Sequence, residues 1–184
     1  MFKICKEFQF DYGHRVWSQK LNVELSLDGY CKCRHLHGHR GLVGVELVAK
    51  ELKDGMVTDF KHLNFFKKFI DDAVDHKFII DKNDPNFEYI TGCNPQNTVF
   101  IYHDHHKTLA LPAHLTDEKA EVRSSYVVVD FVPTSENLCK WFYEILVDKL
   151  KGTGIAVSKV YFKETPSSYS EYTPNVEELN DYIK

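Results

Sequence analysis

The chain has 184 residues, of which 43% are hydrophobic and 27% are charged, and its formal net charge is −4. This composition is typical of one folded globular domain, whereas a general nucleic-acid-binding protein is expected to be basic. No apolar run approaches the roughly 20 residues of a membrane span, and the N-terminal stretch MFKICKEFQFDYGHR does not resemble a secretion signal. We therefore expect neither a nucleic-acid partner nor a membrane.

The cysteines indicate a reducing compartment. There are five of them, an odd number that does not suit a framework of disulfides. We expect a cytoplasmic protein whose cysteines are free thiols or metal ligands.

Strands are predicted near both ends of the chain. Residues 2–10 and 39–50 alternate between polar and apolar side chains, and residues 157–163 do the same. Residues 19–34 are mixed and predict a loop. Lys53-Asp54-Gly55 predicts a turn after the second strand.

Two helices are predicted from apolar residues at helical spacing. Asp59 is a candidate N-cap for the first helix, whose apolar stripe is Phe60, Leu63, Phe66, Ile70 and Val74. The second helix begins near Thr134-Ser135-Glu136 and stops at Gly152. Its apolar stripe is Leu138, Trp141, Phe142, Ile145, Leu146 and Leu150.

The middle region, residues 82–130, is irregular and rich in turn residues. TVFIYH (98–103) and SSYVVVDF (124–131) are typical of strands and could form a hairpin. No Gly/Ser-rich or Pro-rich linker marks a boundary, so we interpret this region as an elaboration of a single domain.

The stretch CKCRHLHGHR, residues 31–40, concentrates side chains that bind metals. His37 and His39 are two residues apart on a predicted strand, so they share one face about 6 to 7 Å apart and could hold one metal ion. Gly38 between them would allow another backbone to approach closely. His14 ends the first strand segment and is the candidate third ligand, which would leave the open fourth position of a catalytic zinc site.

Two other interpretations of this stretch stay open. A closed structural zinc site could use Cys31, Cys33, His37 and His39, although structural sites usually have wider cysteine spacing. The same residues could instead be surface polar groups near a turn. A second cluster, HDHH from His103 to His106, could bind metal but is better interpreted as a solvated loop.

Further residues could move protons or bind a ring. A thiol beside zinc and Arg34 could act as a base. Asp75-His76 ends the first predicted helix and is a candidate second pair, because a carboxylate orients an imidazole; the alternative is a histidine that only complements the helix dipole. Glu164 follows strand 157–163, and its carboxylate could accept two parallel hydrogen bonds from the N–H/NH₂ edge of a guanine-like or pterin ring.

Together these motifs resemble the 6-pyruvoyltetrahydropterin synthase family. FQFDYGHR, C-x3-HGH ending at His39, GMVTDFKHL, DH, PTSENL and KET occur in the family's order and cover most of the chain outside residues 82–130. The resemblance implies an α+β tunnelling fold, in which an antiparallel four-stranded sheet carries two helices on one face. It implies a single domain over residues 1–184, with a β-rich insertion at about 82–130 that is longer than the family's connection. Family members form homo-oligomers, trimers or hexamers, with active sites at subunit interfaces.

The resemblance also implies the site. The zinc ligands would be His14, His37 and His39. A cysteine would act as base or acid, with Asp75 and His76 as the second proton-transfer pair, while Glu164 would anchor the pterin ring and Thr134 would lie near it. The substrate would be 7,8-dihydroneopterin triphosphate, whose side-chain hydroxyls Zn²⁺ would bind and acidify.

Cysteine spacing bears on the product. The bacterial branch, 6-carboxytetrahydropterin synthase of queuosine (deazaguanine) biosynthesis, resembles C-x3-HGH, which Cys33 fits. The pyruvoyl-forming branch resembles C-x5-HGH, which Cys31 fits. We favour Cys33, and with it a lyase that forms 6-carboxy-5,6,7,8-tetrahydropterin with release of triphosphate and acetaldehyde. The alternatives are a 6-pyruvoyltetrahydropterin synthase, which only eliminates triphosphate, and a non-catalytic zinc-stabilised binding module.

Overall fold

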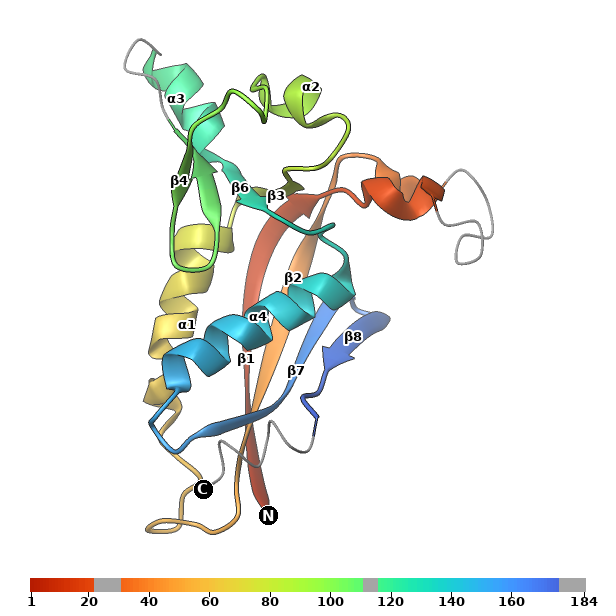
Figure 1. Ribbon diagram of the computed structural model, residues 1–184. Helices are drawn as coiled ribbons and strands as arrows, with labels where there is room; N and C mark the ends of the chain where they lie inside the picture. The colour runs from red at the N-terminus through yellow and green to blue at the C-terminus, as the bar shows by residue number, and fades with distance from the viewer. Residues whose placement is uncertain (22–30, 111–115, 176–184) are drawn as a thin grey trace. The chain divides into compact units, whose positions relative to one another are not determined.

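The computed structural model describes residues 1–21, 31–110 and 116–175 (Figure 1). Its strands are β1 (Phe2–His14), β2 (His37–Ala49), β3 (Lys77–Asp81), β4 (Phe100–Tyr102), β5 (Lys107–Leu109), β6 (Tyr126–Val129), β7 (Ala156–Thr165) and β8 (Ser168–Tyr172). Its α-helices are α1 (Asn64–Phe69), α2 (Phe87–Thr91), α3 (Asp117–Ser124) and α4 (Ser135–Leu150), and shorter helical turns cover Trp17–Leu21, Lys32–Arg34, Phe60–Leu63 and Ile70–Val74. Across the described residues, no helix has the length and apolar character that a membrane span requires.

The protein has an α+β fold, but its sheet differs from the predicted four-stranded antiparallel one. Within the described residues, eight strands form a mixed sheet in the order β4-β5-β6-β3-β1-β2-β7-β8. β2, β7 and β8 pair antiparallel, whereas β1–β3 and β3–β6 are parallel pairs. The middle of the chain supplies the additional strands. Their sequences are short, and two of them form a parallel pair, so they lack the long alternation that reveals a half-exposed antiparallel strand.

The chain divides into two compact units, and β1 and β2 run through both. The first unit comprises residues 1–10, 40–72 and 135–184, and the second comprises residues 11–39 and 73–134. The strands predicted at residues 2–10, 39–50 and 157–163 are confirmed as β1, β2 and β7, and those predicted at residues 98–103 and 124–131 are confirmed as the shorter β4 and β6. The predicted loop over residues 19–34 lies partly outside the described residues, and the described parts form helical turns at its two ends.

Aromatic side chains make up the core of the first unit. Phe142 of α4 packs edge-on against Phe10 of β1 and Phe66 of α1, with ring centroids 5.9 and 5.8 Å apart. Phe66 in turn meets Phe8 of β1 at 5.3 Å. Since Phe8 and Phe10 are two residues apart on one strand, α1 and α4 cover the same face of β1.

Both predicted helices form, with one difference in the first. The Asp59 side chain accepts a hydrogen bond from the Lys61 N–H at 2.8 Å, as a cap should. The segment then continues as a 3₁₀ turn, α1 and a π turn rather than as one α-helix. Its buried residues are Leu63, Phe66, Ile70 and Val74, whereas Phe60 is 42% exposed and was wrongly placed in the apolar stripe. The predicted stripe of α4 is buried throughout.

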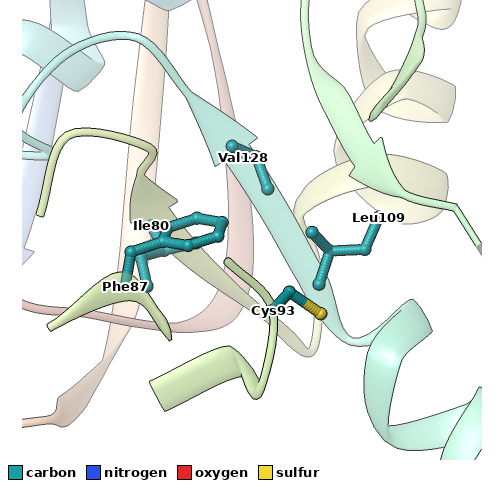
Figure 2. Packing of buried hydrophobic residues seen from close by; sticks show 5 residues of the cluster. All are labelled: Ile80, Phe87, Cys93, Leu109 and Val128. Atoms are coloured by element: carbon teal, nitrogen blue, oxygen red, sulfur yellow. The ribbon is translucent and has the colours of Figure 1, made fainter. Parts of the chain in front are cut away.

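The second unit has a smaller apolar core. Ile80, Leu109 and Val128 come from three neighbouring strands, and Phe87 and Cys93 come from the segment that covers them (Figure 2). The predicted hairpin between residues 98–103 and 124–131 is wrong, because β5 lies between β4 and β6 and pairs with both. The sequence KTL of β5 is too short to show a strand period.

Truncating the aromatic core should destabilise the protein. We expect Phe142→Ala to lower the free energy of unfolding by about 3–5 kcal/mol, because it leaves a cavity among packed rings. Tyr169→Ala, at a side chain that is 64% exposed, should change it by less than about 1 kcal/mol. Urea denaturation of both variants measures the difference, and equal effects would show that these rings do not carry the core.

Candidate metal centre

Two strands bring three histidines together. His14 ends β1, and His37 and His39 begin β2. One nitrogen from each imidazole lies within 4.8 Å of the others. The His14 ring is fully buried and its centroid lies 4.5 Å from that of His37 and 5.3 Å from that of His39. The side chains therefore converge on one point, as the alternation of β2 and the place of His14 predicted.

Main-chain carbonyls orient two of the three rings. His14 Nδ1 lies 2.6 Å from the carbonyl oxygen of Pro133, and His37 Nδ1 lies 2.7 Å from that of His35. A carbonyl only accepts, so Nδ1 must be the protonated nitrogen in each ring. Nε2 then carries the lone pair that a metal ion needs, and the carbonyl fixes the direction in which it points.

Electrostatics favours neutral imidazole at the centre. Burial lowers the pKa of His14 from 6.5 to about 4; the hydrogen bond to Pro133 opposes this shift, and the neighbouring His37 and His39 add to it. A neutral ring is the form that binds metal. A set of three imidazoles suits zinc, which binds His nitrogen readily and leaves a fourth position open in catalytic sites.

The other candidate metal clusters are not assembled. Within the described part of the chain, the side chains that could hold a metal are those of His14, His37 and His39, and no cysteine is among them. This argues against the closed site of Cys31, Cys33, His37 and His39. His103 to His106 form the turn between β4 and β5, where the His103 N–H donates to the His106 carbonyl at 2.9 Å.

Gly38 permits the close approach of backbones that its position between two histidines suggested. A Cβ atom on Gly38 would lie 3.0 Å from the Tyr12 carbonyl oxygen. One on Gly13 would lie 2.6 Å from the Phe78 ring. Both glycines flank histidine ligands: a side chain at position 38 would press on the β1 backbone, and one at position 13 would displace the Phe78 ring.

Cys33 is tied to the strand that carries His14. It lies in the 3₁₀ turn Lys32–Arg34, and Cys31 precedes that turn. The Val16 N–H donates to the Cys33 carbonyl at 2.7 Å, two residues beyond His14. Both cysteines are half-buried. The turn therefore fixes the Cys33 backbone directly against the end of β1.

Asp75 and His76 are held together by the backbone of β1. His76 Nδ1 lies 2.9 Å from Asp75 Oδ2, the Asp11 N–H donates to Asp75 Oδ1 at 2.8 Å, and the His76 N–H donates to the Asp11 carbonyl at 2.7 Å. Burial alone would raise the pKa of Asp75, but the hydrogen bonds from Asp11 and His76 outweigh it and lower that pKa. Asp75 therefore stays ionised beside the imidazole. Asp11, which holds both residues, lies three residues along β1 from His14.

Thr134 and Glu164 are the remaining predicted site residues. Thr134 is half-buried and directly follows Pro133, whose carbonyl contacts His14. Glu164 lies within β7, in the first unit, and its place in a site stays a prediction.

Sequence analysis missed the groups that support the ligands. The carbonyls of His35 and Pro133 belong to the main chain, so their residue types carry no signal, although PTSENL was noted as a motif. Asp81 and Asp84, both buried, contact residues that follow His14. Their segment, DKND (residues 81–84), has the composition of an exposed turn. Its burial depends on strands that pack around it, and the sequence of the segment does not reveal them.

Removing one imidazole should abolish tight metal binding. We expect His14→Ala, purified with Zn²⁺ and dialysed, to hold much less than one equivalent, because two imidazoles bind a metal far more weakly than three. His103→Ala, in the β4–β5 turn, should keep the metal content of the parent. Elemental analysis by mass spectrometry measures both, and unchanged zinc in His14→Ala would refute the three-histidine centre.

Acidification should destabilise the metal-free protein through His14. Its folded pKa of about 4 lies below the unfolded value of 6.5, so the unfolded chain takes up the proton first and stability falls as the pH drops between those values. The shift corresponds to about 3 kcal/mol. Urea unfolding of the metal-free parent and of His14→Gln, at about pH 7 and pH 4, should show their stability difference change by about that amount. A pH-independent difference would contradict it.

Known proteins are similar to this chain over nearly its whole length. The family model described as 6-pyruvoyl tetrahydropterin synthase matches residues 3–175. A protein of Aquifex aeolicus named 6-carboxy-5,6,7,8-tetrahydropterin synthase is 32% identical, over 93% of this chain and 97% of its own. An uncharacterized protein of Wolinella succinogenes has a crystal structure that covers 95% of this chain and 98% of its own, with 44% identity and a TM-score of 0.88.

A more distant structure shares the fold. The 6-pyruvoyl tetrahydropterin synthase of Plasmodium vivax is 16% identical and superposes with a TM-score of 0.57, over 95% of this chain and 98% of its own. The family model spans both units and includes all three histidines. This chain belongs to the 6-pyruvoyl tetrahydropterin synthase family.

Proposed function

We propose that this protein is a zinc-dependent 6-carboxytetrahydropterin synthase. It would convert 7,8-dihydroneopterin triphosphate to 6-carboxy-5,6,7,8-tetrahydropterin and release triphosphate and acetaldehyde. The observation that carries the proposal is the cluster of His14, His37 and His39 in a chain whose nearly full-length relative bears that name. The relative's name supports the product, and the histidine cluster supports the metal chemistry that we propose for its formation.

The metal centre would hold the substrate by its side chain. When bound, Zn²⁺ would supply a Lewis acid that polarises the hydroxyls of that side chain. His14 is the ligand that the fold constrains most, because its ring is buried and hydrogen-bonded. Glu164 would bind the ring edge of the pterin, and Thr134 would contact the same ring.

Proton transfer would involve two groups on either side of β1. Cys33 would exchange a proton with the substrate from the turn that Val16 anchors. His76 would do so from the Asp75 pair; its side chain is 77% exposed, so the ring nitrogen that faces away from Asp75 can meet substrate or water. Asp75 would hold the ring in one orientation.

The favoured thiol is Cys33 rather than Cys31. The Cys33 carbonyl accepts a hydrogen bond from the N–H of Val16, two residues after His14, whereas Cys31 precedes the turn and its carbonyl accepts from the Arg34 N–H. The alternative, a 6-pyruvoyltetrahydropterin synthase, would use Cys31.

At the level of the whole molecule, the family match across both units supports one tunnelling-fold domain over residues 1–184. We also expect a trimer or hexamer with active sites at subunit interfaces, which analytical ultracentrifugation would test.

Substrate turnover separates these possibilities. Incubated with 7,8-dihydroneopterin triphosphate, the protein should release triphosphate and acetaldehyde in equal amounts. Cys33→Ala should stay folded and zinc-loaded while losing about 10²- to 10⁴-fold in rate, the usual contribution of a general acid or base. Cys31→Ala, the matched control, should remain close to the parent.

Three other results would contradict parts of the proposal. Triphosphate without acetaldehyde, with the loss in Cys31→Ala instead, would identify the pyruvoyl-forming reaction. Binding of zinc and substrate without any product would identify a non-catalytic module. An active Cys33→Ala would remove the thiol from the mechanism.

A further inference from the structure

Three consecutive residues after the ligand His14 are each fastened to another segment. Arg15 Nε lies 3.2 Å from Asp84 Oδ2, an ion pair whose two atoms are not in hydrogen-bond geometry. The Val16 N–H donates to the Cys33 carbonyl at 2.7 Å. The Trp17 indole N–H donates to Asp81 Oδ2 at 2.9 Å. The chain that leaves the metal centre is therefore held at every residue, twice by carboxylates from the same short loop.

Those carboxylates are buried. Asp81 is 2% exposed and Asp84 is 4% exposed, and the Arg15 side chain paired with Asp84 is only 12% exposed. A buried carboxylate is costly unless hydrogen bonds or an opposite charge compensate it. Breaking one partner leaves an uncompensated charge inside the protein, so these contacts resist rearrangement.

The loop that carries the two aspartates is rigid in its own right. Asp81 Oδ1 accepts hydrogen bonds from the Asn83 backbone and side-chain N–H groups at 2.9 and 3.0 Å. The Asp84 N–H donates to the Asp81 carbonyl at 3.0 Å, and the Phe87 N–H donates to the Asp84 carbonyl at 2.8 Å. Phe87 itself belongs to the apolar cluster of the second unit (Figure 2). The loop can therefore act as a fixed support.

Sheet register places this support beside His14. β1 and β3 are parallel, with Tyr12 opposite Lys77 and Gly13 opposite Phe78. Continued by one residue, this register sets His14 beside Ile79, and Asp81 follows on the same face about 6 to 7 Å further along. The support and the metal ligand thus lie on one side of the sheet.

We propose that Asp81 and Asp84 are positioning residues of the metal centre. By holding Arg15 and Trp17 they fix the course of the chain after His14, and through Val16 they fix the turn that carries Cys33. Asp84, at the start of the insertion at about 82–130, would then help to position the metal centre. This proposal rests on the proposed function only for the role of Cys33. Ligand placement within a few tenths of an ångström governs metal affinity, and supporting contacts are typically worth about 10- to 100-fold.

The test uses the full-length protein and metal readouts that need no substrate. Asp84→Asn removes the charge facing Arg15, and Trp17→Phe removes only the indole N–H that binds Asp81. Asp130→Asn is the matched control, because Asp130 pairs with Lys82 and Lys107 and contacts none of residues 15–17. Zn²⁺ affinity is measured by chelator competition, and the visible spectrum of the Co²⁺-loaded protein reports the coordination geometry.

We expect Asp84→Asn and Trp17→Phe to weaken Zn²⁺ binding about 10- to 100-fold and to shift the Co²⁺ bands, and Asp130→Asn to do neither. Unchanged affinity and an unchanged Co²⁺ spectrum in both variants would overturn the proposal. If Asp84→Asn does not fold, Trp17→Phe decides the matter alone, because it keeps the aromatic bulk. A parent protein that binds Zn²⁺ but releases no acetaldehyde would overturn the proposed reaction and leave this test intact.

Discussion

Alternation along β1 is the constraint on which both the core and the metal centre depend. Phe8, Phe10, Tyr12 and His14 occupy successive positions on one face of the strand, and none is more than 4% exposed. Phe8 and Phe10 close the aromatic core of the first unit, while His14 is a candidate ligand in the second. A slip of one residue would turn all four to the opposite face. Burial of the apolar rings, worth about 25 cal/mol per Å², therefore also decides where an imidazole points.

The groups that orient the site are largely main-chain groups. Pro133 and His35 orient two imidazoles through their carbonyls, and Asp11 holds Asp75 and His76 through its N–H and carbonyl. A main-chain carbonyl has no rotamers of its own and moves only if the backbone around it moves. The imidazoles of His14 and His37 are therefore oriented more rigidly than supporting side chains could orient them. The orientation of these rings therefore depends on the pairing of β1 with its neighbours, and the proposed support from Asp81 and Asp84 would act on the chain that follows His14.

This explains how much could be predicted from the sequence. His37 and His39 share a strand face because a two-residue period is a local property, and α4 was predicted because its apolar stripe is long. β3 was missed because KFIID shows no clear alternation, and β5 and β8 are too short to show a period. Asp81 and Asp84 were missed because a turn-like sequence says nothing about burial, which depends on strands that pack around it. The supporting carbonyls have no signature in the sequence at all.

The backbone at His76 gives a physical reason to prefer a functional role over a dipole cap. Its φ is 59°, in the left-handed region that glycine favours after a helix, and a non-glycine residue there costs on the order of 1 kcal/mol. A histidine that merely complements a helix dipole needs no such backbone, because it interacts through charge alone. Here the strained residue is held by Asp11 and its ring by Asp75. The fold thus sustains an unfavourable backbone at the residue whose imidazole Asp75 orients.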